Sequence, residues 1–74
     1  MQTDQLARMA NQIGSFFEAM PDRQEALEGA ARHIRSFWAP PMRRSLLEQL
    51  DGPHGDALSG FIADAVRTHR ALIA

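Results

Sequence analysis

The feature that most constrains this chain is a helical spacing of apolar residues, which proline and glycine interrupt at three points. Between the breaks, apolar residues recur three or four positions apart, which is the period of one face of an α-helix. Pro21 ends the first segment, Pro40 and Pro41 end the second, and the Asp-Gly-Pro-His-Gly run at 51–55 ends the third. The pattern therefore predicts an all-α protein, a small compact bundle of four helices. These helices are expected at about residues 4–20, 22–38, 41–50 and 59–72.

Local signals support these boundaries. Asp22 and Ser59 stand where N-caps are expected, because their side-chain oxygens can accept hydrogen bonds from the free N–H groups of a helix start. Gly14 lies inside the first predicted helix, where glycine costs about 1 kcal/mol relative to alanine. We therefore expect another helix to approach the first one closely at Gly14.

The length of 74 residues predicts a single helical domain, 1–74, with a thin core. The chain has no cysteine, so neither disulfides nor thiolate metal sites can add stability. Domains of this size often gain stability by association. The composition therefore favours a partner protein or a homo-oligomer.

Several function classes are disfavoured by what the sequence lacks. No run of about 18 apolar residues exists, and no segment resembles a signal peptide, so we expect a cytoplasmic protein. The three histidines lie on different elements without an i,i+4 pair, which predicts no metal site. We expect His69 to be a hydrogen-bonded core or interface histidine. No nucleophile, phosphate-binding or zinc-protease motif is present, so we expect neither catalysis nor a bound cofactor.

The most informative segment is 32–47, which carries four arginines, no acidic residue, and a rigid Pro-Pro corner. Trp, Arg and Met are enriched at the centres of protein interfaces. We expect Phe37 to fill the core, whereas Trp38 fits the core and an interface equally well. The predicted partner interface consists of Arg35, Trp38, Pro40, Met42, Arg43 and Arg44.

Other interpretations of this segment are less well supported. A homodimeric helical regulatory or DNA-binding protein is the alternative, in which the short third helix would follow a turn as a recognition helix does. A net charge of −1, with acidic segments on both sides of the arginines, argues against nucleic acid as a partner. A membrane-surface helix would spread basic residues along a whole face, and here they are concentrated at one corner.

Two blocks of the sequence resemble a known family. M-A-N-Q-I-G-S-F-F-E-A-M-P-D-R-Q-E-A-L (9–27) and H-I-R-S-F-W-A-P-P-M-R-R-S-L-L (33–47) are similar to the delta subunit of cytoplasmic, NAD-dependent, molybdenum-containing formate dehydrogenases. The resemblance covers about residues 4–72. Two positions depart from the family pattern: Pro41 stands where a basic residue is frequent, and Gly60 follows Ser59 where proline is frequent.

The resemblance implies a small accessory protein that accompanies large subunits. Those subunits carry the bis-molybdopterin guanine dinucleotide cofactor, the iron–sulfur clusters and the flavin that reduces NAD, and the delta subunit carries none of them. The implied partners are the large subunits, chiefly the molybdopterin-carrying alpha subunit. The implied role is support of assembly, including acquisition of the molybdenum cofactor. The isolated chain could also form a homodimer to cover its exposed apolar surface.

Overall fold

The computed structural model describes residues 3–74, so residues 1–2 of the predicted domain lie outside the described residues. These residues form only helices and connecting turns, and the predicted all-α class is confirmed for them. The elements are α1 (Thr3–Glu18), α2 (Arg23–Phe37), α3 (Pro40–Asp51), the 3₁₀ turn η1 (Gly55–Ala57), α4 (Gly60–Thr68) and α5 (Arg70–Ile73).

Both predicted N-caps are confirmed. The carboxylate of Asp22 accepts hydrogen bonds from the N–H groups of Gln24 and Glu25, at 2.9 and 3.1 Å. The hydroxyl of Ser59 accepts one from the N–H of Ile62 at 3.2 Å. These bonds satisfy helix-start donors that would otherwise lack a partner, so each helix begins where its cap residue stands.

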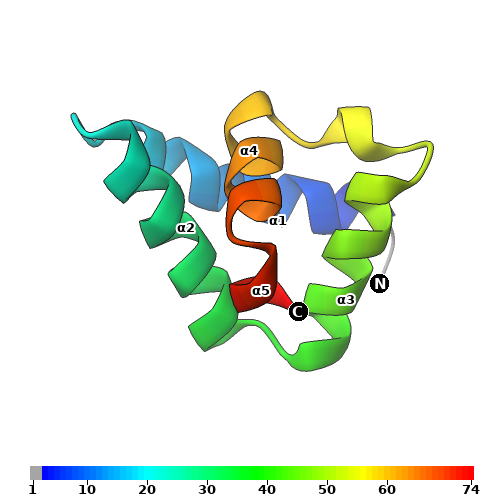
Figure 1. The fold of residues 1–74 in the computed structure, drawn as a ribbon. Coiled ribbons are helices and arrows are strands. Elements are labelled where there is room, and N and C mark those ends of the chain that lie inside the picture. Colours follow the sequence, from blue (N-terminus) through cyan, green and yellow to red (C-terminus); the bar gives the residue numbers. More distant parts are fainter. Residues whose placement is uncertain (1–2) are drawn as a thin grey trace.

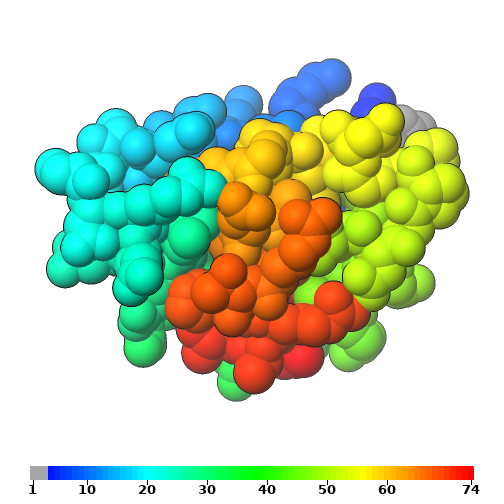
Figure 2. Space-filling model, turned by 45° about the horizontal axis from the view of Figure 1, so that its top comes forward, coloured from blue at the N-terminus to red at the C-terminus, as the bar shows by residue number. Residues whose placement is uncertain are grey.

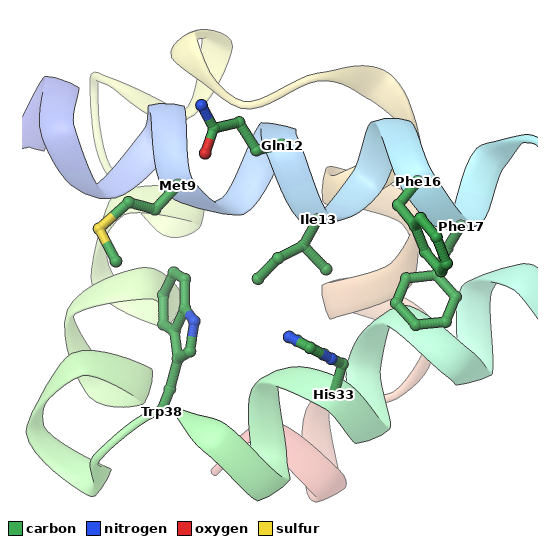
Figure 3. Close-up of a pocket in the computed structure, with 7 residues that line it drawn as sticks. All are labelled: Met9, Gln12, Ile13, Phe16, Phe17, His33 and Trp38. Carbon is green, nitrogen blue, oxygen red and sulfur yellow. The ribbon is translucent and has the colours of Figure 1, made fainter.

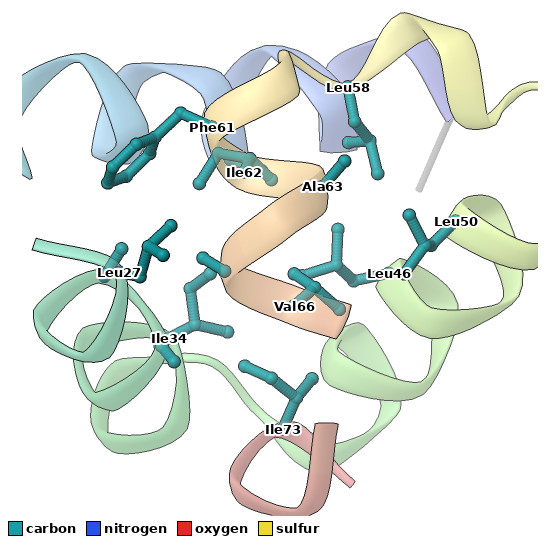
Figure 4. Close-up of a cluster of buried hydrophobic side chains, with 14 of the residues drawn as sticks. Leu27, Ile34, Leu46, Leu50, Leu58, Phe61, Ile62, Ala63, Val66 and Ile73 are labelled. Atoms are coloured by element: carbon teal, nitrogen blue, oxygen red, sulfur yellow. The ribbon is translucent and has the colours of Figure 1, made fainter. Parts of the chain in front are cut away.

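The fourth predicted helix differs from the structure, because it breaks at His69 into α4 and α5. His69 adopts φ −115° and ψ 37°, and its N–H still donates to the carbonyl of Ala65 at 3.0 Å. Its own carbonyl then accepts from Leu72 and Ile73, at 2.9 and 3.3 Å. The bend lets Ile73 become completely buried between α2 and α3 (Figure 4). Burying such a side chain contributes about 1.5–3 kcal/mol, which favours the break over a continuous helix.

Helix α4 occupies the centre of the molecule, with α1, α2 and α3 arranged around it and α5 below (Figure 1). Its buried face supplies Phe61, Ile62, Ala65 and Val66 to the core. The largest fully buried side chains come from four helices: Ile34, Leu46, Ile62, Val66 and Ile73. The short helices therefore share one core, and α4 connects its parts.

Helix α1 contacts α4 closely at Gly14, as expected from the sequence. A Cβ built at Gly14 would lie 2.6 Å from Cγ1 of Ile62, so only glycine leaves room for that side chain. Asn11, one turn earlier, donates to the carbonyl of Ala57 at 3.0 Å and accepts from the N–H of Ser59 at 2.8 Å. The start of α4 is thus attached to α1 by both hydrogen bonds and packing.

The turn between α1 and α2 also packs against α4, as the space-filling view in Figure 2 shows. Arg23 forms an ion pair with Asp64 at 2.6 Å, and its guanidinium lies 5.7 Å from the centre of the Phe61 ring. The accessible surface is 4526 Å². A folded monomer of 8.2 kDa is expected to expose about 4,500 Å². The chain is therefore as compact as a free-standing protein of its mass.

No helix within residues 3–74 combines the length and the apolar character needed to cross a membrane.

Candidate docking surface

The predicted interface residues lie around the connection between α2 and α3, where the expectation for Phe37 is wrong and the open alternative for Trp38 is decided in favour of burial. Phe37, expected in the core, exposes 74% of its surface, whereas Trp38 exposes only 7%. Adjacent residues on a helix point about 100° apart, and here Trp38 faces the core while Phe37 faces solvent. Trp38 is the C-cap of α2, and its N–H donates to the carbonyl of Ile34 at 2.9 Å.

Two of the predicted interface arginines bind backbone carbonyls of this chain. Nη1 of Arg35 donates to the carbonyls of Leu72 and Ala74, at 3.2 Å each. Nη1 of Arg43 donates to the carbonyl of Arg35 at 2.8 Å. These bonds join the end of α2 to the start of α3 and to α5, so both arginines have a structural role in the free chain.

The other members of the predicted interface differ in exposure. Met42 is half-buried and packs against the core, whereas Pro40 is exposed at the first position of α3. Arg44 is exposed, and its side chain makes no hydrogen bond or ion pair with any other residue among 3–74. Pro40 and Arg44 are therefore the members of the set with the most freely available side chains.

A surface that sequence reasoning missed lies between α1 and α2. It is an open groove with a volume of about 460 Å³, and we call it the aromatic groove (Figure 3). Seven residues line it: Met9, Gln12, Ile13, Phe16, Phe17, His33 and Trp38. Trp38 thus connects the groove to the predicted interface at the start of α3.

Aromatic rings from both helices form a continuous row beside this groove. The ring centres of Phe16 and Phe17 are 5.2 Å apart, those of Phe17 and His33 are 5.9 Å apart, and those of His33 and Phe37 are 4.7 Å apart. Phe16 and Phe37 each expose 74% of their surface. The sequence held a signal for this arrangement: the side chains of adjacent helical residues such as Phe16 and Phe17 point in different directions.

The polar groups of residues 3–74 show no arrangement suited to metal binding. No three His, Asp or Glu side chains within this range come together as metal ligands would. His69, expected to be hydrogen-bonded, is half-buried at the helix break, and its side chain forms no hydrogen bond with residues 3–74. His33 lies in the aromatic groove and His54 in the exposed connection before η1.

The shifted pKa values belong to ion pairs at the surface. A hydrogen bond from Arg32 to Glu28, 2.7 Å long, lowers the pKa of Glu28, and this i,i+4 contact joins successive turns of α2. The hydrogen bond from Arg70 likewise lowers the pKa of Asp51 and raises that of Arg70. The first pair lies within α2 and the second joins α3 to α5, both at the protein surface.

An all-α fold with one exposed aromatic face defines a small helical protein of the kind that associates with other polypeptides. The family model for the NADH-dependent formate dehydrogenase delta subunit, FdsD, matches residues 5–66, and the chain belongs to this family. Family membership indicates an accessory chain that associates with other formate dehydrogenase subunits. No curated protein and no solved structure matches the chain.

Proposed function

We propose that this chain is a non-catalytic accessory subunit of a cytoplasmic, NAD-dependent, molybdenum-containing formate dehydrogenase. It binds no cofactor of its own and docks on the alpha subunit, which carries the molybdopterin. The observation that carries this proposal is the family match over residues 5–66, which spans most of the chain. The exposed aromatic residues on a compact domain support it, because apolar surface of this kind is typical of proteins with partners.

The docking region includes the corner at the start of α3. Pro40 and Arg44 are exposed there, and Trp38 leads from this corner into the aromatic groove. A guanidinium without a counter-ion suits a carboxylate on the partner, because arginine forms planar, paired hydrogen bonds with such groups. Arg35 and Arg43 support this corner through their backbone contacts, and Met42 fills the space beneath it.

The role that follows is support of assembly or of molybdenum-cofactor acquisition. A small protein that binds one conformation of a large subunit more tightly than another shifts the population toward the conformation it prefers. If that conformation is open to the bulky cofactor, the accessory subunit promotes insertion. If it is the mature one, the accessory subunit stabilises the complete enzyme.

The test is to produce the large subunits with and without this chain and to measure two quantities. We expect the alpha subunit to co-purify with the chain, and its molybdenum content to be lower when the chain is omitted. Activity restored by adding the chain to finished large subunits would instead indicate the stabilising role. A chain that neither co-purifies with the large subunits nor changes their molybdenum content or activity would contradict the proposal.

A further inference from the structure

The aromatic groove has a preformed floor. Met9, Ile13 and Phe17 pack against the core, and Trp38 is almost completely buried at one end. Gly29 makes room for Phe17, because a Cβ at Gly29 would lie 2.8 Å from Cε1 of that ring. A surface that is already ordered loses little conformational freedom when it binds, which favours docking.

The lining of the groove indicates the chemistry of its occupant. None of its seven residues carries a carboxylate or a guanidinium, so the occupant must present mainly apolar side chains. Gln12 and His33 are its polar members, and they come from opposite helices (Figure 3). Neither side chain forms a hydrogen bond with residues 3–74, so both are available to a polar group on the occupant.

The dimensions favour a helix. The α1 side of the groove extends from Met9 to Phe17, which corresponds to about 12 Å along a helix axis. This length equals about two helical turns, enough for apolar side chains at positions i, i+4 and i+7 of a partner helix. A groove between two diverging helices accepts the ridge of a third helix, with side chains interdigitating as in ordinary helix packing.

Charged residues that follow the two ends of the groove along the chain indicate a direction for the occupant. Glu25 lies on the same i+4 row of α2 as Gly29, His33 and Phe37, close to the turn that joins α1 to α2. It is exposed and forms no ion pair within residues 3–74. Past Trp38, which lies at the opposite end, Arg43 and Arg44 are the next cations along the chain; neither forms an ion pair within residues 3–74, and Arg44 is the exposed one. A helix with its positive N-terminus toward Glu25 and its negative C-terminus toward Arg44 is complementary to this arrangement.

A second copy of this chain fits the groove less well. A symmetric pair whose two-fold axis passes through the groove would bring two hollows face to face and leave space unfilled. Packed interfaces reach the density of a protein interior, which a convex helix achieves in a concave groove.

The geometry points to the aromatic groove as the binding site for an amphipathic helix of the large subunit, apolar at i, i+4 and i+7 and oriented by Glu25 and Arg44. This inference rests on the function proposed above.

The test uses the full chain co-expressed with an affinity-tagged alpha subunit. The double variant Phe16→Ser with Phe37→Ser removes both exposed rings and leaves the buried core unchanged. The matched control, Gln24→Ser with Ala71→Ser, alters two exposed side chains outside the groove. Far-UV circular dichroism of each purified variant checks folding, and analytical ultracentrifugation of each isolated chain measures its oligomeric state.

We expect recovery of the double variant with the alpha subunit to fall by about tenfold or more, as when central aromatic residues of an interface are truncated. The control should be recovered like the wild type. Equal recovery of the wild type and the folded double variant would overturn the groove inference alone. So would a double variant that loses self-association but keeps the alpha subunit, because the groove would then be a contact between copies. A wild-type chain that is not recovered at all would overturn the proposed function, and this inference with it.

Discussion

Replacing Gly14 by alanine should destabilise the protein, even though alanine is the better helix former. In an isolated helix this change would gain about 1 kcal/mol. In the folded chain the new methyl group would lie 2.6 Å from Cγ1 of Ile62 and 3.4 Å from Cδ2 of Phe61. Carbon atoms in ordinary contact are about 3.5–4.0 Å apart, so α1 and α4 must separate or Ile62 must leave its rotamer.

The balance of the two effects gives the magnitude. Overpacking a core costs about 1–3 kcal/mol, and the upper part of this range applies because Ile62 is completely buried and the new methyl group would also lie 3.0 Å from its Cδ1. After subtraction of the helix-propensity gain, Gly14→Ala should lower the free energy of unfolding by about 1–2 kcal/mol. For a domain of this size, that corresponds to a decrease of about 5–15 °C in the melting temperature.

Gly60→Ala is the matched control. Gly60 is the first residue of α4, and a Cβ there would meet no atom within 4 Å. The same chemical change should therefore raise the free energy of unfolding by about 0.4–1 kcal/mol, mainly by restricting the unfolded chain.

Both variants can be compared with the wild type by thermal and urea unfolding. Far-UV circular dichroism reports the helices, and fluorescence of Trp38, the single tryptophan, reports the core. If Gly14→Ala is as stable as the wild type, or gains stability like Gly60→Ala, then α1 and α4 do not pack as described. The reasoning from their close approach would then be wrong.

Two further predictions concern polar contacts. Asp51→Asn should make the loss of stability in acid less steep. The hydrogen bond from Arg70 lowers the folded-state pKa of Asp51. The stability that the Asp51 carboxylate contributes is therefore present above the ordinary carboxyl pKa of about 4 and is lost as the pH falls through the lower folded-state value. Thermal unfolding followed from about pH 7 to about pH 2 checks this, and identical acid profiles would contradict it. Arg43→Ala should cost about 1 kcal/mol, because the carbonyl of Arg35 loses its donor, whereas Arg44→Ala should change stability by less than about 0.5 kcal/mol. If Arg43→Ala and Arg44→Ala shifted the midpoint of urea unfolding equally, the structural role assigned to Arg43 alone would be wrong.

Much of the fold could be predicted from local patterns. Pro21 and Pro40 end helices because proline lacks an N–H donor and restricts the residue before it. Asp22 and Ser59 begin helices because their side chains accept the first free N–H groups. Each of these effects acts between residues within about four positions of one another, so it can be predicted from the sequence alone.

The candidate site was predictable only in part. The segment containing Trp38 and Arg44 stood out by composition, and the structure places it at an exposed corner. The aromatic groove did not stand out, because its walls come from α1 and α2, which meet only after folding. The backbone contacts of Arg35 and Arg43 were equally hidden, since Arg35 reaches carbonyls 37 and 39 positions away in the chain.

By itself, the sequence determined the all-α class, the helix boundaries set by prolines and caps, and the motif blocks that mark the family. Tertiary structure alone decided that Trp38 is buried and Phe37 exposed, and that the last helix bends at His69. The physical reason is the range of the forces involved. Capping and chain stiffness act between near neighbours, whereas burial depends on which distant helices supply the surface that each side chain meets.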